Sequence, residues 1–195
     1  PSYPPGTSLK EKLGPRLWRR LINRKTGLSR RALRRLRPWF VLVNMEMLRL
    51  NRSNESIDKQ LYSWARALDK DVGFLESPRQ HFAALQRGMS LQTLRRLLEE
   101  EPDQQVEHEQ IKRAYESGDP GRLKRLVMQE SVVLRKGTEA YRILIAKRNH
   151  AWLETLKHQI ERGDVFVAAG VGHFVGPDSV IALLRDAGYT VERVP

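Results

Sequence analysis

Apolar residues recur every three or four positions along most of this chain, which is the spacing of amphipathic helices. The pattern predicts a first helix that begins after Thr7 or Ser8. It also predicts a long helix from Thr138 or Glu139 to Arg162. Between these two, it predicts helices near 39–50, 56–68, 78–85, 90–100, 103–117 and 122–130. The chain should therefore be predominantly helical.

Three short apolar runs that favour strands interrupt this pattern, at 72–75, 165–169 and 190–194. The last two flank a short helix that opens at Pro177 and ends before Gly188. A strand–helix–strand unit of this kind usually joins parallel neighbours. The sequence therefore predicts an α/β (α+β) fold, predominantly helical, with a small and mainly parallel central sheet.

Composition supports one folded domain, because 195 residues with 40% hydrophobic content are enough for a core. There are no cysteines, which excludes disulfides, a thiolate zinc site and a cysteine nucleophile. No apolar run approaches the roughly 20 residues of a membrane span. We therefore expect a single domain over 1–195, with a basic helical segment at 7–37.

The net charge of +12 is concentrated near the start of the chain. Residues 1–40 hold twelve lysines and arginines against one acid, Glu11. Such a segment can bind phosphates or an anionic membrane surface, or it can be a solvated basic face. The aromatic residues Trp18 and Trp39 are too few for base stacking, which argues against sequence-specific nucleic-acid recognition. The candidate anion-binding residues are Arg19, Arg20, Arg24, Arg31, Arg34 and Arg35. We also expect this segment to add little to the core.

Glu76 and His173 each follow an apolar run and each precede a helix that begins with proline. If the runs are parallel strands, both side chains emerge at one edge of the sheet, where open α/β folds place ligands. A carboxylate and an imidazole there can bind a divalent metal or act as an acid–base pair. The alternative for Glu76 is a solvated or helix-capping acid.

Three glycines surround His173, at Gly170, Gly172 and Gly176. They can let the backbone approach a ligand closely, or they can serve turn geometry alone. Their spacing departs by one residue from the dinucleotide-binding fingerprint, and the chain continues for only one further strand, so we set that interpretation aside.

Arg148 and Asn149 lie on the long predicted helix, with Arg148 on the same side as Ile145 and Trp152. A buried arginine needs an anionic partner, and asparagine offers both a donor and an acceptor. The alternative is a solvated arginine beside a tolerated asparagine. The other histidines are predicted to be surface or interfacial residues: His81, His108, His150 and His158.

The segment VFVAAGVGHFVGPDSVIALLRDAGYTVERV resembles the C-terminal signature of the TraB/PrgY/GumN family, which includes the Tiki-type membrane metalloproteases. Residues 170–173 match its Gly-x-x-His loop, although Phe174 stands where the family more often has leucine. DKDVGFLESPRQ, at 69–80, resembles the strand that ends in the family's glutamate, and Arg148-Asn149 matches its Arg-Asn pair. The resemblance spans nearly the whole chain.

The resemblance implies a metal-dependent hydrolase, peptidase-like, with zinc, manganese or cobalt as the metal. It implies that His173 and Glu76 are metal ligands or an acid–base pair, that Arg148 stabilises an oxyanion or holds the glutamate, and that Asn149 orients a ligand. The family also has an upstream strand ending in a first Gly-x-x-His, which this sequence does not contain. We therefore expect an N-terminally incomplete domain that is not a competent metalloenzyme as given.

The expected partner is a peptide or small-molecule substrate, and the resemblance implies a place in the cell envelope or periplasm. A peripheral contact with an anionic membrane, through the arginine-rich helices, is the alternative binding role. A further alternative is an interaction or regulatory protein that keeps the fold without catalysis.

Overall fold

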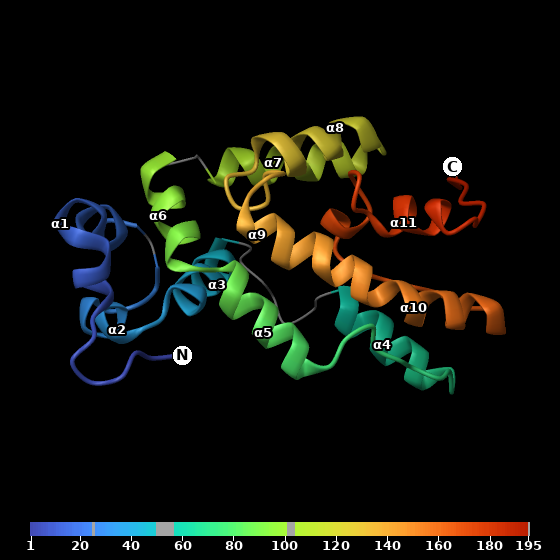
Figure 1. Ribbon diagram of the computed structural model, residues 1–195, viewed down its shortest axis with the longest axis horizontal. Coiled ribbons are helices and arrows are strands. Elements are labelled where there is room, and N and C mark those ends of the chain that lie inside the picture. Colours follow the sequence, from blue (N-terminus) through green and yellow to red (C-terminus); the bar gives the residue numbers. More distant parts are fainter. Residues whose placement is uncertain (25, 50–56, 101–103, 195) are drawn as a thin grey trace.

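The computed structural model (Figure 1) describes residues 1–24, 26–49, 57–100 and 104–194. Within these ranges the regular structure is helical. The elements are α1 (Leu9–Ile22), α2 (Arg30–Arg35), α3 (Pro38–Arg49), α4 (Ile57–Ala67), α5 (Pro78–Gly88), α6 (Leu91–Glu100), α7 (Gln104–Glu116), α8 (Pro120–Arg125), η1 (Leu126–Glu130), α9 (Glu139–Tyr141), η2 (Arg142–Ala146), α10 (Lys147–Arg162), η3 (Val171–His173) and α11 (Val180–Asp186).

The prediction of an α/β fold with a central parallel sheet is wrong, because the described residues form no strand. The predicted strands at 72–75, 165–169 and 190–194 run as unpaired chain, whereas an isolated antiparallel bridge joins Ser2 and Leu36. A β-type pattern predicts which residues turn inward, and Val167 and Ala169 do pack on a helical cluster. A strand also needs a partner for its backbone groups, which a local pattern cannot supply.

Polar residues at the predicted positions start the helices. The Ser77 side chain accepts from the Gln80 backbone N–H, and the Gln80 side chain accepts from the Ser77 backbone N–H, so α5 begins with a capping box. The long helix predicted to end at Arg162 is confirmed as the continuous run α9–η2–α10, which begins after the Thr138 cap. Five residues of this run, Arg142–Ala146, form a wide π-helical turn.

The first hydrophobic cluster joins α1, α2 and α3 to α6, and it overturns the expectation that the basic segment adds little to the core. Five apolar side chains of α1 are buried, and Leu33 and Leu36 join them from the next segment. The arginines therefore occupy the outer faces of helices whose inner faces are fully packed. Burying each large apolar side chain contributes about 1.5–3 kcal/mol, so the segment is integral to the fold.

Two further clusters lie along the long helix. One packs η2 against α7, α8 and η1, and the other packs α10 against α11. In Figure 1, α10 runs past α11 on one side, while α5 lies against the beginning of the long helix. By contrast, α4 has no buried side chain, and its Trp64 is exposed. The candidate site residues lie where α5, α10 and η3 meet.

Candidate functional site

Three local structures bring the predicted site residues together. Glu76 directly precedes the Ser77 cap of α5, Arg148 and Asn149 lie in the first turn of α10, and His173 ends the short helix η3. The structure therefore places all four candidates in one hydrogen-bonded group, although no sheet edge presents them. Their functional roles stay predictions.

Arg148 and Glu76 form a two-point ion pair with little exposure of either side chain. Nε of Arg148 donates to Oε2 at 3.0 Å, and Nη2 donates to Oε1 at 2.7 Å. Burial raises the pKa of Glu76, but hydrogen bonds from Arg148 and His81 outweigh it, so the pKa lies below its usual value. Glu76 is therefore ionised at neutral pH and serves as the anion that the buried arginine requires.

His173 is held in one tautomer by its two neighbours. Its Nε2 lies 3.2 Å from Nη1 of Arg148, and because arginine can only donate, Nε2 is the acceptor. Its Nδ1 lies 2.5 Å from Oδ1 of Asn149 and must therefore donate to it. Burial, and then the charge of Arg148, lower the pKa of His173 to about 4. The imidazole is therefore neutral at physiological pH, with its lone pair directed at the guanidinium.

Asn149 is fully buried and anchors this arrangement to the neighbouring loop. Its Nδ2 donates to the backbone oxygens of His173, at 3.2 Å, and Asp178, at 2.7 Å, which leaves Oδ1 as the acceptor for the imidazole. The hydroxyl of Tyr141 donates to Oδ2 of Asp178 at 2.6 Å. Burial and then the Asp178 carboxylate raise the pKa of Tyr141, which stays protonated as a donor.

His81 joins this hydrogen-bonded group, although the sequence predicts only a surface or interfacial residue. Its Nδ1 lies 2.7 Å from Oε1 of Glu76, and its side chain is 44% exposed. Glu76 stands just before the cap Ser77, and His81 is the fourth residue of α5. At a helix start, the side chains at these two positions often contact each other. The five-residue spacing of Glu76 and His81 across this helix start could therefore have predicted their contact, because polar side chains can meet there as apolar ones do.

Of the three loop glycines, only Gly176 is required by its surroundings, since a Cβ on Gly172 would make an ordinary contact. Gly176 has φ +94, and a Cβ there would lie 3.0 Å from Sδ of Met128. A Cβ on Gly172 would lie 3.4 Å from Cδ1 of Ile145, whereas Gly170 faces open space. These contacts are with the protein itself, so the glycines serve packing and turn geometry here.

The sequence profile of the TraB/PrgY/gumN family matches residues 2–193. The chain belongs to this family. The match confirms the resemblance at the level of the family over nearly its whole length. No curated protein and no solved structure matches the chain.

For a family implied to bind a divalent metal, the donor set of this chain is a poor fit. In the described part of the chain, no group of three or more His, Cys, Asp or Glu side chains could hold an ion. The Arg148 guanidinium stands between Glu76 and His173, bonded to both. Two like unit charges about 4 Å apart repel by about 4 kcal/mol near a protein surface, and a divalent ion would double this. As placed, the residues do not fit a metal.

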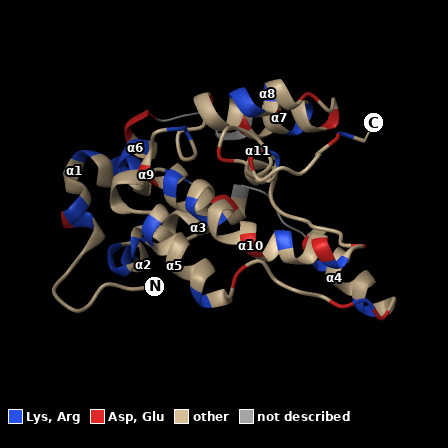
Figure 2. Ribbon diagram, turned by 45° about the vertical axis from the view of Figure 1, so that its right-hand side comes forward, with Lys and Arg blue, Asp and Glu red and all other residues tan. Residues whose placement is uncertain are grey.

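The arginines proposed for anion binding do not converge on one site in this family member. Arg20 donates to the backbone oxygens of Leu98, at 2.8 Å, and Glu99, at 3.2 Å, and so caps the end of α6. Arg31, Arg34 and Arg35 are exposed on α2. Figure 2 shows basic residues along both α1 and α2. Within the described residues, no helix is both long and apolar enough to cross a bilayer.

Proposed function

We propose that this family member is a peptidase-like hydrolase in which Arg148 and His81 bind and polarise a carbonyl substrate, while Glu76 and His173 hold these two side chains in position. The observation that carries the proposal is the buried Glu76–Arg148 ion pair beside a histidine fixed in its neutral form. Charges arranged in advance, with little water around them, are the usual means of stabilising the charge that develops during acyl transfer. The divalent zinc, manganese or cobalt implied by the resemblance does not fit beside the Arg148 guanidinium, and the proposed reaction does not use a metal.

Arg148 has one N–H left for a substrate oxygen. Its Nε and both hydrogens of Nη1 have acceptors in Glu76, Leu144 and His173. One hydrogen of Nη2 bonds Glu76, and the other points toward Nδ1 of His81 at 3.5 Å. That nitrogen must donate to Glu76 and so cannot accept. The remaining Nη2 hydrogen is the group that can bind a carbonyl oxygen and then the oxyanion.

His81 supplies the complementary proton acceptor. Because Nδ1 donates to Glu76, the neutral ring carries its lone pair at Nε2, and the side chain is partly open to solvent. A water molecule that attacks the carbonyl carbon can give its proton to Nε2 of His81, while the carbonyl oxygen gains negative charge beside Arg148. When the carbonyl re-forms, the bond to the leaving amine or alkoxide breaks, and the leaving group takes the proton back from Nε2. His173 and Asn149 hold Arg148 and the loop in place.

The test is hydrolysis of a mixed fluorogenic peptide pool and of p-nitrophenyl acetate, with a chelator present. We expect turnover by the full chain and a loss of about 100-fold or more in Glu76→Gln and in His81→Ala. The exposed neighbour His150→Ala is the matched control and should keep full activity. Absence of turnover in the full chain, or full turnover in Glu76→Gln, contradicts the proposal.

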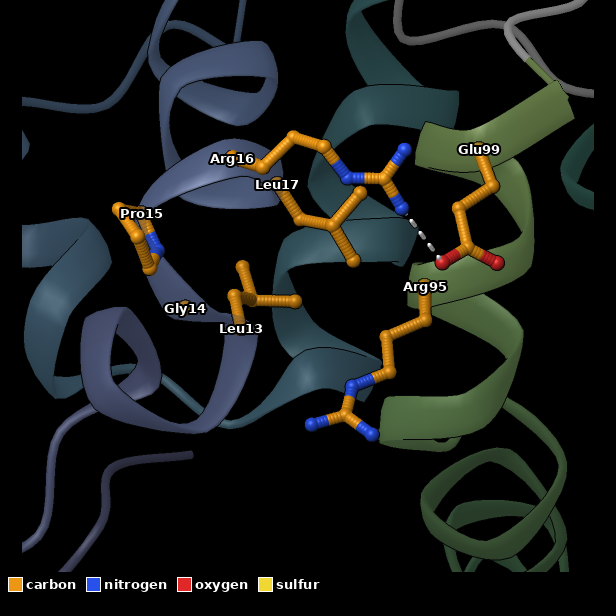
Figure 3. A pocket seen from close by; sticks show the side chains of 7 residues that line it. All are labelled: Leu13, Gly14, Pro15, Arg16, Leu17, Arg95 and Glu99. Atoms are coloured by element: carbon orange, nitrogen blue, oxygen red, sulfur yellow. Dashed lines mark hydrogen bonds and ion pairs between the residues drawn. The ribbon is translucent and has the colours of Figure 1, made fainter.

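A second candidate function is binding of an anionic membrane surface through α2. Arg30, Arg31, Arg34 and Arg35 are exposed there, and none of the four forms an ion pair with another described residue. An open hollow of about 450 Å³ beside them is lined by Lys10 and Arg34, among others. A neighbouring hollow of about 280 Å³ differs, because Arg16 reaches across it to Glu99, as Figure 3 shows, and uses its charge there.

Binding through α2 should be purely electrostatic, because the apolar faces of α1 and α2 are buried in the core. Sedimentation with phosphatidylserine vesicles should therefore weaken steeply as salt rises and disappear in Arg31→Glu/Arg34→Glu. The paired acid-to-base control Glu116→Lys lies on α7 and should not change binding. Binding that is insensitive to salt contradicts this function.

A further inference from the structure

The guanidinium of Arg148 is surrounded by the same lone pairs that a metal ion would use. The two oxygens of Glu76 lie 2.7 and 3.0 Å from its nitrogens, and Nε2 of His173 lies 3.2 Å away. The Leu144 backbone oxygen accepts from it at 3.0 Å. Nδ1 of His81 lies 3.5 Å away and donates to Glu76, so His81 would offer a lone pair here only in its other tautomer. These groups come from three separate segments of the chain and face one cation.

The imidazole of His173 is arranged as in a metal site, although its partner is a guanidinium. Oδ1 of Asn149 accepts a hydrogen bond from Nδ1–H, which leaves the lone pair of the ring on Nε2. In metal sites, a second group that holds the other ring nitrogen fixes the tautomer in the same way. The site is therefore built to receive a cation from this side.

We propose that Arg148 is the resident cation of this site and that it excludes a divalent metal ion from Glu76, His81 and His173. Its charge is permanent, since guanidinium keeps its proton in proteins. Its position is also fixed, because it stacks on the Trp152 ring at 4.9 Å and donates to Leu144. The inference concerns occupancy by metal and stands whether or not the chain hydrolyses the proposed substrates.

Without the Arg148 charge, the site should bind the divalent metal ion that it otherwise excludes. Glu76, His81 and His173 would then face a space of guanidinium size with no positive charge in it. Because these groups contact different nitrogens of the guanidinium, each must move inward by roughly 1.5–2 Å to share one ion at the roughly 2.0–2.2 Å of metal–nitrogen and metal–oxygen bonds. The proton on Nδ1 of His81 must also pass to Nε2. Three protein ligands and an open position are the usual set for a catalytic divalent ion.

The experiment is a titration of the full chain with Co²⁺, followed by visible absorption and by calorimetry, with no substrate present. Wild type, Arg148→Lys and the control Arg142→Met should show no stoichiometric uptake. Arg142 is an exposed arginine of the same helical run, paired with Glu139. Arg148→Met should bind one Co²⁺ at least tenfold more tightly than wild type and show ligand-field absorption. The double variant with His173→Ala should lose this binding.

Stoichiometric Co²⁺ in wild type that is lost in His173→Ala overturns the proposal. So does a folded Arg148→Met that binds Co²⁺ no more tightly than wild type. If Arg148→Met loses its helical circular dichroism, Arg148→Gln takes its place with the same expectation, because its amide can still donate to Glu76. Failure of hydrolysis, measured separately under chelation, bears only on the proposed function.

Discussion

Replacement of Asn149 by alanine should be among the most damaging single changes in the protein. The side chain is fully buried and makes three hydrogen bonds, two as donor to backbone oxygens and one as acceptor from His173. Alanine makes none of them, and the cavity it leaves is closed off from bulk water. Two carbonyl oxygens and one imidazole N–H then lose their partners.

The magnitude follows from those three groups. A typical hydrogen bond contributes about 0.5–1.5 kcal/mol, and each buried partner left unsatisfied costs about 1–3 kcal/mol. Allowing for relaxation around the cavity, we expect the free energy of unfolding to fall by about 3–5 kcal/mol. For a chain of this length, such a change lowers Tm by roughly 10 °C.

The assay is urea and thermal unfolding followed by far-UV circular dichroism, with His150→Ala as the control one residue away. His150 is exposed and should change the free energy of unfolding by less than about 0.5 kcal/mol. If the free energy of unfolding of Asn149→Ala lies within about 1 kcal/mol of wild type, the three hydrogen bonds do not stabilise the loop, and the tautomer of His173 depends on Arg148 alone.

Three further predictions concern stability. The pKa of His173 is lowered from 6.5 to about 4, so between these pH values the unfolded chain binds a proton that the folded chain does not. The free energy of unfolding should therefore fall by about 3 kcal/mol as the pH drops from 6.5 to 4. Urea unfolding at several pH values should show that this free energy depends less on pH in His173→Gln. Gly88→Ala should destabilise by about 1–3 kcal/mol in thermal melts, since its Cβ would lie 2.5 Å from Cγ of Leu144, whereas Gly73→Ala, in open space, should be neutral; equal effects contradict the packing. Deleting residues 1–27 removes five buried apolar side chains and should abolish cooperative unfolding of the cluster that joins α1, α2 and α3 to α6. A small drop in Tm would instead indicate that the segment is peripheral.

The helices could be predicted because their signals are local. The start of a helix at Pro78 and the end of one at Arg162 depend on neighbours a few residues away, and both appear as the sequence indicates. The sheet depended on pairing between residues about 90 positions apart, such as 72–75 and 165–169, and the local pattern contains no information on whether that pairing forms.

The grouping of Glu76 and His173 was predicted correctly although the sheet was not. Glu76 and His173 both precede helices that pack on the long helix, so they meet there whether or not the intervening chain forms strands. His81 was missed because a solvent-facing position and a site position look alike in a helical pattern, and only the fold-back at the helix start separates them. The structural use of Arg20 depended on where α6 ends in space, which no local signal records.

The wide π-helical turn at Arg142–Ala146 sets the rotational phase of the long helix. Tyr141 and Asn149 are eight residues apart, and in a regular α-helix they would be about 80° out of phase, at about 100° per residue. The wide turn takes up one extra residue, which reduces the offset to about 20° and lets both side chains reach Asp178. Seven residues of regular α-helix would align Tyr141 and Asn149 as well as the eight residues with their wide turn do. Deleting one residue from the turn should therefore keep both side chains directed at Asp178. Adding or deleting a residue elsewhere between Tyr141 and Asn149, with the wide turn kept, should rotate one of them away.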